Sequence, residues 1–222
     1  MVKSIFYKEW LKIRLFLIGF TLLSLVGMFY ILLSLKHGFA FSGGKNMWNE
    51  LLFQGEQFFR PLKFVPLTGG ILIAVAQYLP ETVNKRLKLT FHLPLAENKA
   101  VMLMHLFGFL GLITSFSLIF GSFVALTAYY FPAEIVMSCI WSVIPWFLAG
   151  LSSYFIVSIV ILEPVWINKF IYLLTGSFFL SVFLLSPLTA AYHPAIGGLL
   201  LFCVLLSFVI LLPAYKFRKG EM

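Results

Sequence analysis

The sequence predicts an all-α membrane protein with six transmembrane helices, and three observations lead to this fold class. The chain of 222 residues is 61% hydrophobic and 11% charged, whereas soluble domains carry about 25% charged residues. Six apolar runs approach or exceed the length of about 20 residues that crossing a bilayer requires. The basic residues concentrate on one side of these runs. We therefore treat residues 1–222 as one polytopic transmembrane domain.

A short amphipathic helix is predicted ahead of the first span, in the stretch "MVKSIFYKEWLKIR" at 1–14. Phe6, Trp10 and Ile13 follow at the spacing of one apolar helix face. The residues of the opposite face are Lys8 and Lys12. A basic helix with a tryptophan is typical of one that lies in the membrane interface. The alternative is an ordinary positive flank of the first span.

The six predicted spans follow along the chain. Their ranges are 15–35, 62–79, 101–131, 135–162, 167–185 and 196–215. The first run is too long for the core of a signal peptide and no small-residue cleavage pattern follows it, so we expect this span to be retained. Pro66, followed by a Gly-Gly pair, predicts a kink in the second span. The third and fourth exceed the bilayer requirement, which predicts tilt or an extension beyond the membrane.

Small residues recur on the third span and predict that another helix comes close. These residues are Gly108, Gly111, Ser115 and Ser122. Between the first two spans, 37–60 is expected to be an outer loop, with a short aromatic helix that starts near residue 47 and rests on the outer leaflet. Trp48, Phe58 and Phe59 are expected to anchor it in the interface. A ligand-binding lid is the alternative for this loop.

Lysine and arginine counts predict the topology. With the N-terminus in the cytoplasm, twelve of these residues lie in inside segments and four in outside segments. The inside residues are Lys3, Lys8, Lys12, Arg14, Lys85, Arg86, Lys88, Lys99, Lys169, Lys216, Arg218 and Lys219. We expect a multi-pass protein of the inner (cytoplasmic) membrane with both termini cytoplasmic. Orientation and contact with anionic lipid then explain the net charge of +8, and no nucleic acid is expected as a partner.

The chain lacks the residue patterns of most membrane enzymes and carriers. It has no aspartate, and its eight glutamates all fall at predicted span ends or in loops. This excludes intramembrane aspartyl chemistry and argues against an ion-coupled carrier, which places ionisable groups at mid-membrane. There is no P-loop motif to hold ATP phosphates. We expect no catalytic residue and no cofactor in this chain.

Metal or haem binding is not expected either. The four histidines have no metal-ligand spacing, and His105 is expected at the membrane interface. Cys139 and Cys203 lie in apolar runs and are expected to be packing residues. Since the chain carries no reactive group of its own, another subunit is expected to supply the energy for any work it performs.

The most polar stretch, "PETVNKRLKLTFHLPLAENK" at 80–99, separates the second and third spans. Pro80 suits the first turn of a new helix, and Glu81 would then benefit from that helix's N-terminus. Basic residues alternate with apolar ones until Pro94 ends the element. The apolar residues are Leu87, Leu89, Phe91 and Leu93. They would be exposed to water unless the membrane or a partner covers them.

This arrangement resembles the permease subunits of type-two ABC exporters, also called type V exporters. The resemblance lies in the six-span layout, in Lys8-Glu9 within "YKEWLKIR", and in the polar segment with Glu81, Leu93-Pro94 and Lys99. It implies an N-terminal elbow helix, with the residues Phe6, Lys8, Glu9, Trp10 and Lys12. It also implies a cytoplasmic coupling helix that docks on the ATPase, with the residues Glu81, Lys85, Arg86, Lys88, Phe91, Leu93 and Pro94.

The resemblance further implies a division of labour. A separate ABC ATPase subunit would hold ATP and Mg and hydrolyse the nucleotide. A second permease subunit, the same chain or a related one, would complete a dimer that exports an unidentified substrate. The modest outer loop departs from the large sterol and drug exporters with elaborate outer domains. Two other functions are possible from the sequence: a non-transport membrane scaffold or assembly factor, and, less favoured, an integral membrane enzyme such as a lipid transferase.

Overall fold

The computed structural model describes residues 2–53, 57–83, 97–185 and 190–219. In these ranges the regular structure is entirely helical and contains no strand. Six helical stretches of the described residues are long and apolar enough to cross a membrane, which confirms the predicted all-α class with six candidate spans. The elements in chain order are α1 (Val2–Phe53), η1 (Arg60–Phe64), α2 (Val65–Val83), α4 (Glu97–Tyr130), α5 (Ala133–Leu162), α6 (Trp166–Leu184), η2 (His193–Ala195), α7 (Ile196–Val209) and α8 (Leu211–Lys219).

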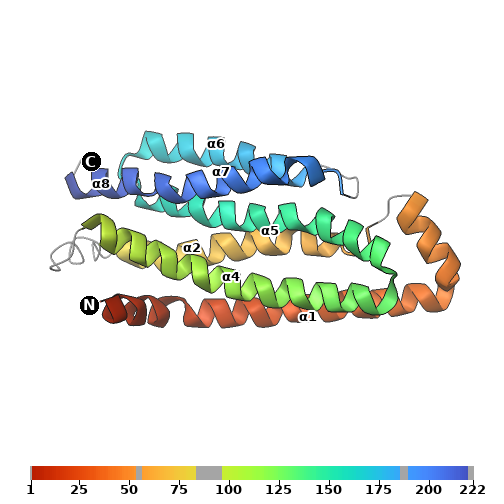
Figure 1. The fold of residues 1–222 in the computed structure, drawn as a ribbon. Helices are drawn as coiled ribbons and strands as arrows, with labels where there is room; N and C mark the ends of the chain where they lie inside the picture. Colours follow the sequence, from red (N-terminus) through yellow and green to blue (C-terminus); the bar gives the residue numbers. More distant parts are fainter. Residues whose placement is uncertain (1, 54–56, 84–96, 186–189, 220–222) are drawn as a thin grey trace.

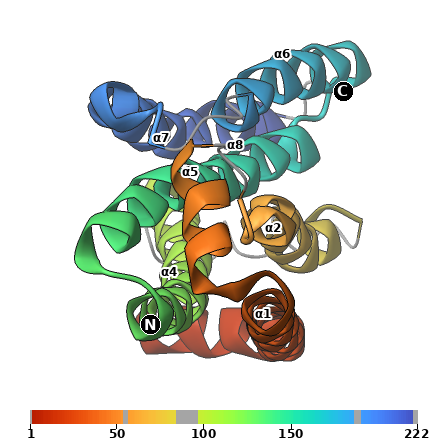
Figure 2. The same ribbon diagram turned by 90° about the vertical axis from the view of Figure 1, so that its right-hand side faces the viewer.

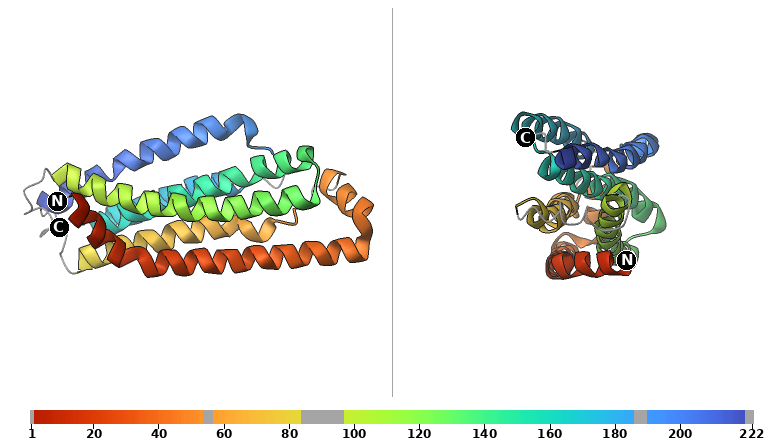
Figure 3. Two further views of the ribbon diagram at one scale, coloured as in Figure 1. Left: turned by 60° about the horizontal axis from the view of Figure 1, so that its bottom comes forward. Right: turned by 90° about the vertical axis from the view of Figure 1, so that its left-hand side faces the viewer.

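The first helix is longer than the sequence predicts. Separate segments are expected at 1–14 and 15–35, but α1 is helical without interruption from Val2 up to a kink at Gly43. A second helical part then continues to Phe53, in agreement with a short helix inside the expected outer loop at 37–60. The kink is at Gly43, whose φ of 72° lies in the region that glycine adopts without steric cost. No proline interrupts the chain before this point. Figure 3 shows the first turns of α1 bent away from the axis of its long middle part.

Two expectations based on prolines are wrong. Pro66 is the second residue of α2, a position that proline favours, so it begins the helix and does not kink it. Pro80 does not start a new helix, because α2 continues through it to Val83. Glu81 therefore lies in the last turn of α2, and the helix N-terminus expected to favour its charge is absent there.

The centre of the bundle is α5 (Figures 1 and 2). It packs against α2 and α4 on one side and against α6 and α7 on the other, while α1 packs against α2 and α4. In the most apolar part of α5, 67% of the residues are buried inside the chain, compared with 11% in α6 and 11% in the span that contains α7. The outer faces of α6 and α7 are therefore left to lipid or to another subunit.

Glycines bring α2 and α5 into direct backbone contact. A Cβ atom on Gly70 would overlap the carbonyl oxygen of Gly150, and one on Gly150 would lie 2.6 Å from that of Pro66. Ser153 donates a hydrogen bond of 3.0 Å from Oγ to the carbonyl oxygen of Leu67 across the same interface. Close packing and interhelical hydrogen bonds of this kind hold helices together in a bilayer, where burial of apolar surface contributes little.

The small residues of the third span approach α1, as predicted. A Cβ atom on Gly111 would lie 2.7 Å from Cδ1 of Leu17. Ser115 Oγ accepts a hydrogen bond of 2.9 Å from Thr21 Oγ1. Both contacts join α4 to α1, so the expected close approach is confirmed at these two positions.

The aromatic residues before α2 do not all act as surface anchors. Phe59 is fully buried, and its ring centroid lies 5.5 Å from those of Phe123 and Trp146. The expectation of an interfacial anchor is therefore wrong for Phe59, because its ring completes the core at this end of the bundle. Phe58 is partly buried beside it. The side chain of Trp48 lies outside the described residues.

The start of α1 and the end of α8 lie at the same end of the bundle (Figures 1 and 3). The last turn of α2 and the first turn of α4 lie there too. Most of the predicted coupling segment, 84–96, lies outside the described residues. That part contains Lys85, Arg86, Lys88, Phe91, Leu93 and Pro94. Placement of this end in the cytoplasm stays a prediction from the charge bias.

Candidate functional site

Two glutamates and two lysines form an ion-pair cluster between α1 and α2. The side chains of Glu9 and Glu81 are fully buried. Lys12 lies between them, with Nζ 2.6 Å from Glu9 Oε1 and 2.9 Å from Glu81 Oε1. Lys8, the more exposed lysine, lies 2.9 Å from the same oxygen of Glu81. Two negative and two positive charges balance, so the cluster as a whole is neutral.

The buried side of α1 differs from the predicted apolar stripe. It is formed by Ile5, Glu9 and Ile13, which are four residues apart and so lie above one another on the helix. Trp10, expected on the stripe, is 41% exposed. A glutamate can occupy the middle of this side because Lys12 neutralises it, whereas an unpaired buried carboxylate would be strongly unfavourable.

Gln77 extends the cluster into the centre of the bundle. Its Nε2 donates hydrogen bonds to Glu9 Oε2 at 3.0 Å and to the carbonyl oxygen of Met104 at 2.7 Å. Its Oε1 accepts a hydrogen bond of 2.8 Å from Tyr154 Oη. These partners belong to α1, α4 and α5, so one amide on α2 connects four helices. Without such partners a buried polar group would cost about 1–3 kcal/mol.

Tyr78 and His105 form a second polar contact beside Gln77. Tyr78 Oη lies 2.9 Å from His105 Nδ1. The imidazole stacks on the ring of Tyr154, with centroids 5.1 Å apart. His105 is 4% exposed, so its side chain is buried inside the bundle and does not extend to the surface as the sequence predicts. The two tyrosines supply the polar and aromatic contacts that allow the imidazole to be buried.

Gly108 leaves the space in which Gln77 and Tyr154 meet. A Cβ atom at this position would overlap both Gln77 Oε1 and Tyr154 Oη. We therefore expect Gly108→Ala to lower the free energy of unfolding by about 1–3 kcal/mol, because the hydrogen bond between those atoms is lost. Thermal or denaturant unfolding of the purified chain in detergent measures the change.

The matched control for this prediction is Gly121→Ala on the same helix, where no atom lies within 4 Å of the added Cβ. That variant should be neutral or stabilised by about 0.5–1 kcal/mol. Adding Gly108→Ala to Tyr154→Phe should cost less than it costs alone, since the hydrogen bond is already absent. Equal losses at Gly108 and Gly121, or strict additivity with Tyr154→Phe, would show that Gly108 does not serve this contact.

A second ion pair joins the end of α5 to α8. Glu163 is buried and accepts hydrogen bonds from Lys216 Nζ at 3.3 Å and from Asn168 Nδ2 at 3.1 Å. Desolvation lowers the pKa of Lys216, but the hydrogen bond and charge of Glu163, together with Tyr172, raise it more, and the net pKa lies above the ordinary 10.5. Because the folded-state pKa is raised, the stabilisation is fully present at neutral pH and is lost only as the pH rises through that raised value.

The structure brings three residues of the predicted elbow helix together with one of the predicted coupling segment. Lys8, Glu9 and Lys12 meet Glu81 in the cluster. Phe6 packs instead on a ring of α4, with ring centroids 5.2 Å apart. Since Glu81 has no exposed surface, any part it takes in docking a partner acts through the two lysines.

The site also contains Gln77, Tyr78 and Tyr154, which are not predicted from the sequence as site residues. Gln77 carries a usable signal, because an amide inside an apolar run marks a position that needs a polar partner. The tyrosines carry no comparable signal, since tyrosine is also common at both membrane interfaces.

The cluster offers charge and rigidity, and it locks the start of α1 to the end of α2. Among the described residues, no three His, Cys, Asp or Glu side chains gather closely enough to hold a metal ion. Cys139 and Cys203 are free and buried, in agreement with a packing role. Comparison of the chain with family models, with curated proteins and with solved structures finds no match.

Proposed function

We propose that this chain is the permease subunit of an ATP-driven exporter whose ATPase is a separate subunit. The observation that supports this function is the buried contact of Lys12 with Glu9 and Glu81. Residue 84 follows the last described turn of α2, so the contact stands at the base of the segment expected to bind the ATPase. A coupling device needs an input segment that is firmly attached to the helices it must move.

The polar contacts provide a route from that segment to the rest of the bundle. A displacement of the end of α2 would act on α1 through Lys12 and on α5 through the hydrogen bond between Gln77 and Tyr154. Helices and packed interfaces move as rigid bodies, so such a displacement is transmitted further. In this proposal α2 is the rod that carries the movement of the partner into the membrane.

The partner supplies the chemistry. It would hold ATP and Mg, since this chain has neither a P-loop nor an aspartate. A second permease subunit, identical or related, would enclose the export path with this one. A scaffold or assembly factor would use the same buried cluster with a different partner, so the identity of the partner distinguishes the two functions.

Charge reversal in the coupling segment is expected to reduce binding of the ATPase by at least about tenfold. The variant combines Lys85→Glu, Arg86→Glu and Lys88→Glu, which replaces three positive charges with negative ones on the docking element. Tagged chain is purified from native membranes, and the P-loop ATPase that co-purifies is quantified by mass spectrometry. Lys63→Glu, in η1 before the start of α2, is the control and should retain the ATPase.

Three outcomes contradict the proposal. Equal recovery of the ATPase with the triple variant and with Lys63→Glu would show that the segment does not bind the ATPase. Recovery of partners that include no nucleotide-binding protein would favour the scaffold. Labelling of a Lys88→Cys chain by an impermeant maleimide from outside intact cells would place the segment where no cytoplasmic ATPase reaches it.

A further inference from the structure

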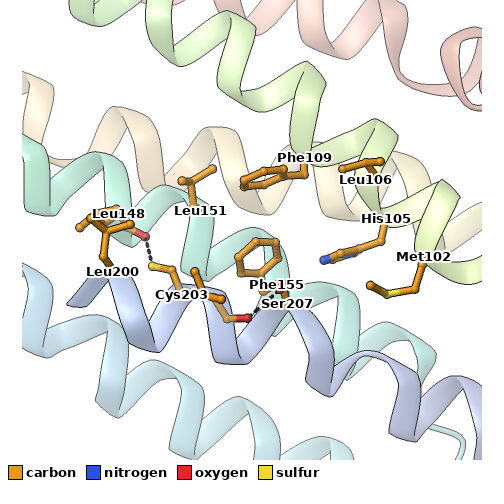
Figure 4. Close-up of a pocket in the computed structure, with 11 residues that line it drawn as sticks. Met102, His105, Leu106, Phe109, Leu148, Leu151, Phe155, Leu200, Cys203 and Ser207 are labelled. Carbon is orange, nitrogen blue, oxygen red and sulfur yellow. Dashed lines mark hydrogen bonds between the residues drawn. The ribbon is translucent and has the colours of Figure 1, made fainter. Parts of the chain in front are cut away.

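A cavity of about 260 Å³ lies between α4, α5 and α7 (Figure 4). Met102 and His105 lie at one end of it, and Leu148 and Leu200 lie at the other. The volume exceeds the roughly 150 Å³ of an apolar cavity that holds benzene and approaches the roughly 300 Å³ at which small-molecule pockets begin. The cavity is therefore large enough for part of a hydrocarbon chain and too small for a bulky ring system.

One buried polar atom in this apolar cavity has no partner. His105 Nε2 is buried and makes no hydrogen bond to any described residue. Figure 4 shows the imidazole projecting from α4 into the space that faces α7. An unsatisfied buried donor or acceptor costs about 1–3 kcal/mol, so native structures rarely leave one without an occupant.

We assign this atom as a donor from the contact with Tyr78. The phenol of Tyr78 is buried, and its hydroxyl needs an acceptor, which His105 Nδ1 supplies at 2.9 Å. In the neutral imidazole the proton then resides on Nε2. A ligand that satisfies this end of the cavity must offer an oxygen acceptor. Met102, an unbranched and flexible side chain at the same end, can move aside for it at low cost.

The depth of the cavity fits a lipid of one leaflet. α4 has 34 residues and is about 51 Å long, so about 10 Å extends beyond a hydrocarbon core of about 30 Å at each end. His105 lies about 12 Å from the start of α4, close to the boundary of the hydrocarbon core. Leu200 lies near the start of α7, which runs from the opposite end of the bundle, so the apolar end of the cavity points toward the membrane centre.

The cavity is open to the membrane from the side. Leu106, Leu200 and Val204 line it and are each about half exposed on the outer surface of the bundle. An acyl chain can therefore enter laterally from the bilayer. The polar atom at the boundary and the apolar end toward the centre match the order of ester group and chain in a phospholipid.

We propose that this cavity binds one acyl chain of a membrane phospholipid, whose ester carbonyl oxygen accepts a hydrogen bond from His105 Nε2. The site does not depend on the function proposed above. It places a lipid at the joint between α4, α5 and α7, in contact with the same histidine that Tyr78 and Tyr154 hold in place.

The test compares an ester lipid with its ether analogue, which lacks the carbonyl oxygen. The delipidated full chain in detergent is titrated with dioleoyl phosphatidylglycerol and with the corresponding diether lipid, and bound lipid is counted by native mass spectrometry. We expect one tightly bound lipid and about tenfold tighter binding of the ester, because one hydrogen bond is at stake. His105→Phe should bind the two lipids equally.

Two tryptophan variants test the cavity itself. Leu200→Trp fills it and should weaken binding of both lipids at least about tenfold, whereas Leu205→Trp, on an exposed part of α7 outside the cavity, should bind like the wild type. The proposal is overturned if the wild type binds no lipid, if it does not distinguish ester from ether, or if both tryptophan variants behave alike. It is also overturned if the wild type is a dimer without bound lipid that Leu200→Trp dissociates, since a second copy then fills the cavity.

Discussion

Replacing Lys12 with methionine is expected to lower the free energy of unfolding by about 3–5 kcal/mol, the typical cost of removing one partner from a buried ion pair. Lys12 is the lysine that contacts both buried glutamates, at 2.6 Å from Glu9 and 2.9 Å from Glu81. Its loss leaves Glu9 charged among apolar side chains, and Gln77 cannot neutralise it. Unfolding of the purified variant in detergent, followed by circular dichroism, measures the effect.

A second substitution shows whether charge or packing causes the loss. Glu9→Gln combined with Lys12→Met should recover at least half of the lost stability, because the new amide is neutral and still accepts a hydrogen bond from Gln77 Nε2. Lys3→Met removes an exposed lysine from the same helix and should leave stability within about 0.5 kcal/mol of the wild type. If Lys12→Met and Lys3→Met were equally stable, the cluster would not be formed as described.

Replacing Gly70 with alanine is expected to lower the free energy of unfolding by about 3 kcal/mol, the upper part of the range for overpacking. The added methyl group would overlap the carbonyl oxygen of Gly150 and Oγ of Ser153. The hydroxyl can rotate, but a backbone oxygen cannot, so α2 and α5 must separate. This separation would also lengthen the hydrogen bond between Ser153 and Leu67.

Gly27→Ala is the matched control for Gly70. Gly27 also lies inside a helix, and no atom is found within 4 Å of the Cβ that alanine would add. That variant should gain about 0.5–1 kcal/mol, because alanine loses less backbone freedom on folding than glycine. A loss of the same size in both variants would mean that intrinsic helix preference, and not contact with α5, determines the effect at Gly70.

The contacts removed by Lys12→Met and by Gly70→Ala both matter for the proposed function, because they hold opposite ends of α2. The cluster fastens the end of α2 to α1, whereas the glycine contact fastens the start of α2 to α5. A helix held at both ends transmits a displacement along its length. A variant that loosens either contact should therefore weaken coupling to the partner even where the partner still binds.

Hydropathy and residue spacing along the chain were sufficient to predict the number of candidate spans and one of the helix–helix contacts. The number of spans follows from run length, because a bilayer imposes the same requirement on every helix that crosses it. The approach of α4 to α1 at Gly111 and Ser115 follows from the recurrence of small residues. These are local properties, and a single sequence contains them completely.

The candidate site could not be predicted from the sequence, because contacts between distant parts of the chain form it. Pro80 and Glu81 locally resemble the start of a helix, yet α2 continues through them to Val83. The charge of Glu81 is compensated by Lys12, which is 69 residues away in the sequence. The sequence predicts that His105 is exposed at the membrane surface, whereas in the structure Tyr78 and Tyr154 surround its side chain. Periodicity assigns a side chain to a face of its own helix, but it does not say which helix packs against that face. Only the packing of α1, α2, α4 and α5 together decided which polar groups are buried, because each needed a partner that another helix supplies.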